Sequence, residues 1–322
     1  MRINTMIKKA ALAICLVGAS TLATADEYHI GVTVPSADHG WTAGLLWWAQ
    51  RATADLAEKY PEVTFTVLAA DSGTSQVADV EDLMVRNIDA LVILPHNPAT
   101  LQRVITEAYE EGIYTVVVDR ELEEPAQDVF MAGNNPGLGE VAARYMAEEL
   151  GGQGDILVLE GPSIPINSQR VDAFNRVMED YPGINILASQ NTDWNPQRAL
   201  SVTEDLLGRF QHVDAIWAGD DDVLMAAMRA IAENQRDEIQ LVVGGGGSQE
   251  VIDLIRNDHP MVKGTVTYPP NMVASAIALA VHGVKGEHLG DMYHGVPSRI
   301  ILAADLITAD NVEQFYEPDA AY

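Results

Sequence analysis

The 322-residue chain has one cysteine, few basic residues and few aromatic residues. Because the cysteine is Cys15, all later segments lack disulfides, thiol nucleophiles and thiolate metal ligands. Only 19 Lys and Arg stand against 47 Asp and Glu, which gives a net charge of −28. This balance argues against nucleic acid and anionic membranes as partners, since binding to either needs clustered Lys and Arg.

Hydrophobic residues make up 48% of the chain. A disordered acidic chain would have fewer, so the composition indicates a folded globular protein. Domains usually span ~100 to 200 residues, so the length predicts about two of them. A chain of this size buries roughly 75% of its unfolded surface and needs no disulfide or metal to stabilise its fold.

Residues 1–25 have the three parts of a secretory signal peptide. They are a basic start, an apolar run over residues 10–17, and the small residues Ala23-Thr24-Ala25. A membrane anchor needs ~20 apolar residues, and this run is shorter. We expect cleavage after Ala25 and export of the mature protein. Cys15 is then removed with the signal peptide.

The acidic excess grows when the signal peptide is removed. Residues 1–25 hold three basic and no acidic residues, so 16 basic residues remain against 47 acidic ones, a net charge of −31. Only Lys59, Lys263 and Lys285 remain as lysines. Salt screens repulsion between like charges, so we hypothesise that the protein works in saline water.

Short β-branched runs alternate with amphipathic segments from residue 28 onward. The strands expected are residues 29–34, 64–69, 90–94, 114–118, 128–131, 156–159, 184–188, 215–217, 240–243 and 262–267. Helices are expected between them, for example over residues 41–59, 74–86, 98–111 and 137–150. The alternation predicts a doubly wound α/β fold, and about ten strands suggest two sheets and two lobes.

Polar and aromatic residues follow the predicted strands in both halves of the chain. These segments are residues 35–42, 119–120, 163–170, 193–195, 220–222, 244–248 and 268–271. Ligands of parallel sheets bind at the carboxyl ends of the strands. The pattern therefore predicts a ligand-binding cleft between two lobes.

The order and spacing of several short motifs resemble the periplasmic sugar-binding proteins of ABC importers, in the ribose-binding-protein-like group of type I. The motifs are Ile30-Gly31-Val32, the loop at residues 38–41, residues 80–83 and 89–93, Val118-Asp119-Arg120, Asn134-Asn135, and residues 170–174, 214–218 and 242–244. The resemblance covers essentially the whole chain after the signal peptide. It implies two Rossmann-like lobes joined by three hinge crossings.

For this chain we expect an N-terminal lobe of residues 26–132 plus 269–297 and a C-terminal lobe of residues 133–268 plus 298–322. The resemblance implies a non-catalytic receptor without cofactor or metal. We expect a monomer that captures a small sugar or polyol and hands it to a membrane permease by hinge closure. A sugar receptor that signals to a chemoreceptor or a sensor kinase is an open alternative.

The resemblance also carries the family's ligand positions onto particular residues. They fall on His39, Trp41, Thr42, Asp119, Arg120, Trp194, Asp220 and Tyr268. Ribose-like members carry an Arg where this chain has Ser168 next to Asn167, with Arg170 two positions later. They carry an Asp where this chain runs through four glycines at residues 244–247. We therefore include Asn167 and Ser168 as candidates and do not expect ribose itself.

These residue types suit a polyol. Flat aromatic side chains such as Trp41 and Trp194 can cover the C–H faces of a sugar, one from each lobe. Asp119 can accept hydrogen bonds from two adjacent hydroxyls, and Arg120 can donate through its planar guanidinium group. Such bonds strengthen the closed state, so binding and closure are coupled.

Several other interpretations remain open. Asp119 and Arg120 are also compatible with an ordinary surface pair, and residues 220–222 with a helix cap or a cation site. The glycines at 244–247 are compatible with a nucleotide loop, as in an exported oxidoreductase, but lack the G-x-G-x-x-G spacing. A backbone that approaches a ligand closely, or a tight strand-to-helix turn, explains the glycines as well. A sugar-responsive regulator would need a DNA-binding segment where the signal peptide lies.

Overall fold

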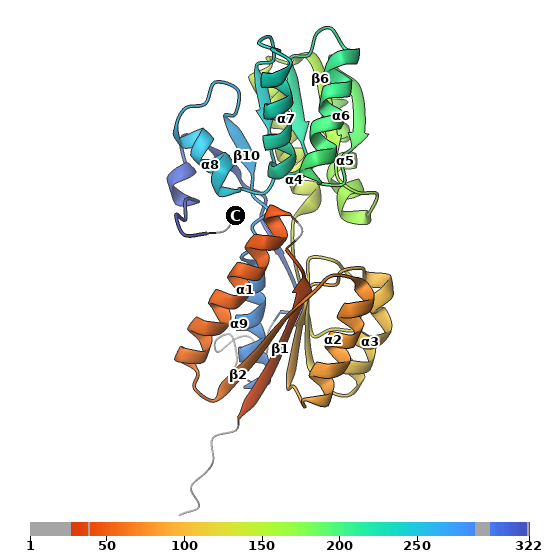
Figure 1. Ribbon diagram of the computed structural model, residues 1–322, viewed down its shortest axis with the longest axis vertical. Helices are drawn as coiled ribbons and strands as arrows, with labels where there is room; N and C mark the ends of the chain where they lie inside the picture. Colours follow the sequence, from red (N-terminus) through yellow and green to blue (C-terminus); the bar gives the residue numbers. More distant parts are fainter. Residues whose placement is uncertain (1–26, 38, 287–296, 321) are drawn as a thin grey trace, which may run out of the picture.

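The computed structural model describes residues 27–37, 39–286, 297–320 and 322. The predicted signal peptide and Asp38 of the first predicted loop lie outside the described residues. Two α/β lobes are stacked along the long axis of the molecule (Figure 1). The predicted two-lobed, doubly wound fold is therefore confirmed.

The first lobe contains elements from both ends of the described chain. They are β1 Tyr28–Pro35, α1 Gly40–Lys59, β2 Val63–Ala70, α2 Gly73–Val85, β3 Ala90–Ile93, α3 Pro98–Glu110, β4 Tyr114–Val118, β5 Val129–Gly133, α9 Met272–Val284 and β11 Arg299–Leu302. The strands form a parallel sheet in the order β11-β5-β4-β3-β1-β2.

The second lobe contains the middle of the chain and a late strand. Its elements are α4 Asn135–Glu149, β6 Gln153–Glu160, α5 Pro165–Met178, β7 Gly183–Asn191, α6 Pro196–Arg209, β8 Ala215–Ala218, α7 Asp221–Glu233, β9 Leu241–Val243, α8 Gln249–Arg256, β10 Gly264–Val266, β12 Leu306–Thr308 and the 3-10 helix η1 Val312–Gln314. The sheet order is β12-β10-β9-β8-β6-β7, with β12 antiparallel to β10.

Local sequence explains where these elements begin and how they pack. The central strands β3 and β8 are buried along their whole length, as expected for parallel strands covered on both faces by helices. The helices α3 and α6 each begin at an Asn-Pro pair. The side chains of Asn97 and Asn195 accept the hydrogen bond of a free N–H in the first turn, and the following proline has no N–H to satisfy.

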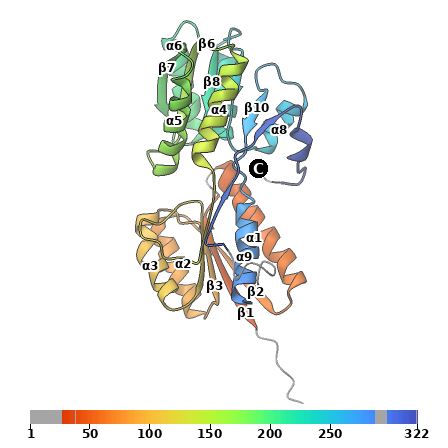
Figure 2. The same ribbon diagram turned by 180° about the vertical axis from the view of Figure 1, so that it is seen from behind.

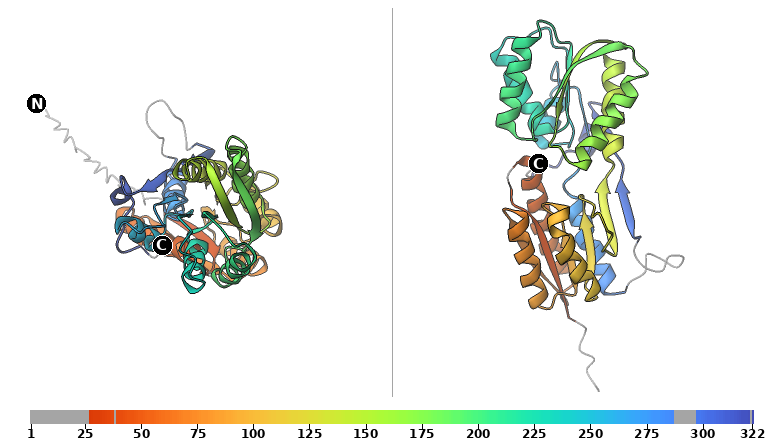
Figure 3. Two further views of the ribbon diagram at one scale, coloured as in Figure 1. Left: turned by 90° about the horizontal axis from the view of Figure 1, so that it is seen from above. Right: turned by 90° about the vertical axis from the view of Figure 1, so that its right-hand side faces the viewer.

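The chain passes between the lobes three times, at the β5–α4, β10–α9 and β11–β12 connections. Figure 3 shows β5 and β11 side by side, and residues 299–302 pair with residues 130–133. The expected change of lobe at residues 297–298 is therefore wrong, because β11 still belongs to the first sheet. Residues 287–296 of the expected first lobe lie outside the described residues.

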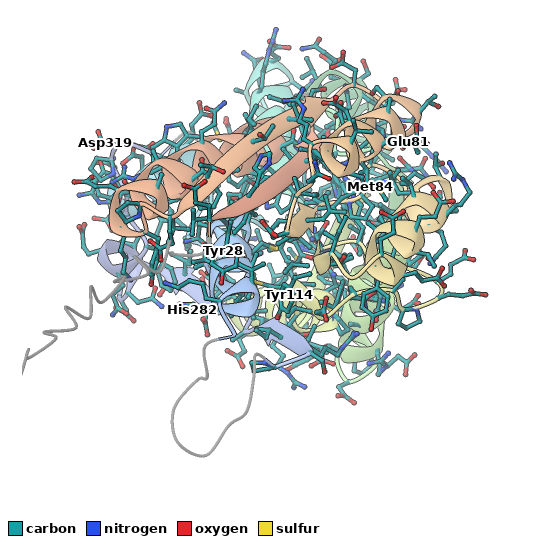
Figure 4. All side chains as sticks on the ribbon, turned by 90° about the horizontal axis from the view of Figure 1, so that it is seen from below. Tyr28, Glu81, Met84, Tyr114, His282 and Asp319 are labelled. Atoms are coloured by element: carbon teal, nitrogen blue, oxygen red, sulfur yellow. The ribbon has the colours of Figure 1, made fainter. Side chains whose placement is uncertain are left out.

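The strands of the first lobe point their carboxyl ends at the second lobe (Figure 2). Their amino ends lie at the remote end of the molecule, where Figure 4 shows Tyr28 at the start of β1 and Tyr114 at the start of β4. The loops that follow the strands of the two sheets therefore face each other across the space between the lobes.

Candidate functional site

A polar and aromatic pocket lies between the lobes. It brings together seven of the ten candidate residues, namely His39, Trp41, Asp119, Arg120, Trp194, Asp220 and Tyr268. It also includes Ile166, Arg170, Gly245 and Gly246, which are not among the ten. Thr42, Asn167 and Ser168 do not line it.

The start of α1 supplies the first wall. The indole Nε1 of Trp41 donates to the carbonyl oxygen of Tyr268 at 2.8 Å, so the ring is fixed across the hinge. Thr42 is buried and acts as a cap instead of a pocket wall. Its Oγ1 accepts from the His39 N–H at 3.2 Å and donates to the His39 carbonyl at 2.9 Å. Thr42 thus holds the first turn that presents His39 and Trp41.

Asp119 and Arg120 follow β4 and face the pocket from the first lobe. Asp119 is 3% exposed and has a left-handed backbone with φ of 64°. Its carboxylate lies 3.8 Å from Arg120 Nε. Arg120 Nη1 donates to the carbonyl oxygens of His96 at 2.5 Å and Pro95 at 3.2 Å. The pair is therefore a buried, anchored group and not an ordinary surface pair.

Tyr268 lies at the β10–α9 crossing. Its hydroxyl donates to Asp119 Oδ1 and accepts from Asn135 Nδ2 at 3.1 Å. A side chain at Gly133 would overlap the tyrosine ring, so this glycine makes room for it. Burial, followed by the charge of Asp119, raises the pKa of Tyr268, so the hydroxyl stays protonated and acts as a donor.

Arg170 is the main pocket residue that the candidate list lacks. Its Nε donates to Asn135 Oδ1 at 2.8 Å and its Nη1 to the Gly219 carbonyl at 3.0 Å. The guanidinium carbon lies 4.3 Å from the Tyr268 ring centre and 5.1 Å from that of Trp194. Such cation–π contacts fix both rings around the pocket.

Helix rotation explains why Ser168 and Asn167 lie elsewhere. Ser168 is on the exposed side of α5, while Arg170 is buried. Asn167 is also buried, but its Oδ1 accepts from the Gly161 N–H at 2.7 Å, which fixes the turn after β6. The signal for Arg170 was its position three residues after Asn167, since residues at i and i+3 share a helix face.

Trp194 forms the wall contributed by the second lobe. It follows β7 with φ of 52°, in a tight left-handed turn with Asp193. A side chain at Gly161 would overlap its indole ring. The buried Nε1 of Trp194 has no hydrogen-bond partner among the described residues. An indole N–H next to the pocket is therefore available to donate to a ligand oxygen.

Asp220 both caps α7 and lines the pocket. Its Oδ1 accepts from the Asp222 N–H at 2.8 Å. Burial, followed by the charges of Asp222 and Asp221, raises its pKa well above the usual value. Asp222 reaches the other lobe, since its Oδ2 accepts from the Gly40 N–H at 2.7 Å. The start of α7 therefore touches the start of α1.

The four glycines at residues 244–247 hold a carboxylate. Asp221 accepts from the N–H groups of Gly247 at 2.8 Å and Ser248 at 2.7 Å, and from Thr265 Oγ1 at 2.8 Å. A side chain at Gly244 would overlap Asp221. A nucleotide phosphate would need the same backbone N–H groups at the start of α8. The nucleotide interpretation of this run is thus opposed by the geometry.

Charge and space limit what the pocket can hold. The lining offers two carboxyl groups, Asp119 and Asp220, and two guanidinium groups, Arg120 and Arg170, so hydrogen-bond donors and acceptors face the same small space. The free volume is about 20 Å³, close to that of one water molecule. Through Asp119, Arg120 and Ile166 the pocket joins a cleft of about 720 Å³. The pocket and this cleft therefore lie next to each other, and the pocket as it stands has too little free space for a sugar.

Within the described ranges, no cluster of three or more His, Cys, Asp or Glu side chains is arranged to hold a metal ion. No helix in the described part of the chain is long and apolar enough to cross a membrane.

Comparison with known proteins agrees with this architecture. Residues 30–288 match the family model described as periplasmic binding protein domain. The ribose import binding protein of Bacillus subtilis is 25% identical over 264 residues, which cover 80% of this chain and 83% of that protein. The xylitol-binding protein of Mycolicibacterium smegmatis is 26% identical over 302 residues, which cover 91% of this chain and 80% of that protein.

A solved structure shares the fold. It is an ABC transporter solute-binding protein from Bacillus halodurans with bound myo-inositol, with a TM-score of 0.79 and 20% identity. The match covers 91% of this chain and 98% of that one. The chain belongs to the periplasmic binding protein family of type I, the group that includes the ribose-binding proteins.

Proposed function

We propose that the protein captures a small uncharged sugar or sugar alcohol between its lobes and delivers it to an ABC transporter permease by hinge closure. One observation carries this proposal. The pocket combines aromatic walls from both lobes with two carboxyl groups and two guanidinium groups. Hydrogen bonds to other protein groups hold Trp41, Arg120 and Arg170 in place around the pocket, and we propose that the ligand is bound and released unchanged.

The chemistry of a polyol fits this lining. Trp41 and Trp194 offer flat surfaces for C–H groups, while Asp119, Asp220 and Arg170 offer charged hydrogen-bonding groups for hydroxyls. Each charged hydrogen bond contributes ~1.5 to 3 kcal/mol, and a missing hydroxyl leaves a buried group without a partner. Selectivity would follow from this penalty. The relatives named for ribose and xylitol support this class of ligand.

The small free volume favours a short ligand. Tyr268 already satisfies Asp119 Oδ1 and occupies the space over Gly133. A pentitol or smaller polyol would displace less protein than a hexose or a disaccharide. We therefore rank linear sugar alcohols of five or fewer carbons first.

Export to the periplasm is part of the proposed function. Members of this family work in the periplasm, and residues 1–25 supply the predicted signal peptide. We propose that cleavage after Ala25 releases a monomer. Mass spectrometry of the exported protein would show a mature chain that begins at Asp26, and a retained residue 1 would contradict this part.

A thermal-shift screen tests the ligand class. The purified protein is melted with tetritols, pentitols, pentoses and hexoses, and with nicotinamide cofactors. A ligand at 100 times its dissociation constant stabilises the folded state by about 2.7 kcal/mol. We expect a polyol to raise the melting temperature and a nicotinamide cofactor to leave it unchanged. The opposite pattern would overturn the receptor proposal in favour of an oxidoreductase.

A further inference from the structure

The short helix η1 and the segment after it are fixed to the second lobe. Arg256 of α8 bonds Glu313 through Nε at 2.8 Å, and its guanidinium carbon lies 3.7 Å from the ring centre of Tyr316. Gln249 Nε2 donates to the Pro318 carbonyl at 3.1 Å. The segment therefore moves with the second lobe when the hinge opens.

Tyr322, in the same segment, reaches the first lobe. The end marked C lies between the lobes, beside the start of α1 and below α8 (Figures 1 and 2). The tyrosine is 8% exposed and belongs to a buried apolar cluster that includes Trp41 and Tyr268. Its side chain is thus buried against both lobes.

Glycines from both lobes form the slot for this ring. A methyl group at Gly44 of α1 would lie 2.5 Å from Tyr322 Cβ, and one at Gly40 would lie 3.0 Å from Cδ2. On the second lobe, a methyl group at Gly246 would overlap the tyrosine oxygen. Three residues without side chains therefore make room for one tyrosine.

We propose that Tyr322 is an interlobe latch, a positioning residue that holds α1 and Trp41 against the second lobe and so raises ligand affinity. It acts through the lobe contact and does not line the pocket. If only the closed form binds tightly, the apparent dissociation constant equals the intrinsic one divided by the closed fraction. The effect on affinity rests on the proposed function, whereas the lobe contact does not.

The ring and not the hydroxyl forms the latch. The Tyr322 hydroxyl is buried and has no hydrogen-bond partner among the described residues. Burial, followed by the charges of Asp220, Asp221 and Asp222, raises its pKa, so it stays neutral. Removing only this oxygen removes no bond. We therefore expect Tyr322→Phe to keep the latch and Tyr322→Ala to lose it.

Gly44→Ala supplies a second, independent variant. Alanine favours the helical conformation of α1, yet its methyl group expels the Tyr322 side chain from the slot. It should reproduce the effect of Tyr322→Ala and add nothing to it in the double variant, since both remove the same contact. Tyr109→Ala at an exposed position of α3 and Gly208→Ala, where the methyl group meets nothing within 4 Å, are the matched controls.

Two measurements decide the proposal. Small-angle X-ray scattering without ligand should show a larger radius of gyration for Tyr322→Ala and Gly44→Ala than for Tyr322→Phe and the controls. Titration with xylitol should show affinity about tenfold weaker, mainly through faster release. An unchanged radius, or an equal loss in Tyr322→Phe, would overturn the latch. A changed radius without binding of any sugar would instead refute the proposed function alone.

Discussion

Asp119 combines an unusual backbone with a central place in the pocket. Its left-handed φ of 64° is tolerated by Asn but strains Ala. We predict that Asp119→Asn weakens polyol affinity at least tenfold, because a charged hydrogen bond of ~1.5 to 3 kcal/mol becomes a neutral one. Isothermal titration with the polyol that gives the largest thermal shift measures this loss.

Asp193→Asn is the matched control for this prediction. Asp193 also has a left-handed backbone, with φ of 55°, and pairs with an arginine, since its Oδ2 lies 2.7 Å from Arg198 Nη1. It is exposed and outside the pocket. The Asp193→Asn variant should bind the polyol with the same affinity as the unchanged protein. Equal affinities in the two variants would remove Asp119 from the proposed site.

Sequence position predicted pocket residues well where they directly follow a strand. Asp119 and Tyr268 lie in the pocket just after β4 and β10, because the carboxyl ends of parallel strands meet at one edge, whereas Trp41 reaches the pocket from the first turn of α1. Prediction failed inside α5, where one residue turns a side chain by about 100° around the helix axis. Ser168 was chosen by resemblance, while the helix points Arg170 into the pocket.

Asp221 shows how a buried carboxylate links several elements. It joins the start of α7 to the loop before α8 and, through Thr265, to β10. Burial raises its pKa to about 6, although these hydrogen bonds oppose the shift. The folded protein therefore holds this proton more firmly than the unfolded chain does.

The raised pKa of Asp221 makes the unfolding free energy depend on pH in a definite direction. The stabilisation by protonated Asp221 is complete below the usual pKa of ~4 and is lost as the pH rises through about 6. We predict that unfolding free energy falls over this range and that the fall is smaller in Asp221→Asn. Urea titrations from pH 4 to 8 measure it, with exposed Asp205→Asn as control. The same slope in both variants would refute this role for Asp221.

Element prediction succeeded for buried strands and failed for short edge strands. The runs at β3, β4 and β8 are almost wholly apolar, which is what a central parallel strand requires. β11 has four residues, begins with Arg299 and alternates in exposure. Its place is fixed by pairing with β5, a contact between distant segments that local sequence does not encode.

At the scale of the whole molecule, resemblance predicted three crossings between the lobes, and three connections join the two sheets. It did not predict the contact of Tyr322 with α1, because the glycines at 40, 44 and 246 carry no pattern that points to a distant ring. Packing between lobes depends on which surfaces meet after folding.

Net charge is a property of the whole molecule, and it yields a prediction about salt. With −31 charges after loss of residues 1–25, repulsion between like charges destabilises the compact state, and salt screens it. We predict that 1 M NaCl raises the melting temperature by about 3 °C or more relative to low salt, which corresponds to roughly 1 kcal/mol. KCl should act alike, since screening depends on ionic strength.

A charge variant separates this screening from other effects of salt. Glu110, Glu111, Glu123 and Glu124 are exposed and lie outside the polar pocket. Replacing all four by Gln removes four negative charges, so the variant should melt higher at low salt and respond less to NaCl. Melting temperatures that are equal at low and molar NaCl, or an undiminished response in the variant, would contradict the saline interpretation of the charge.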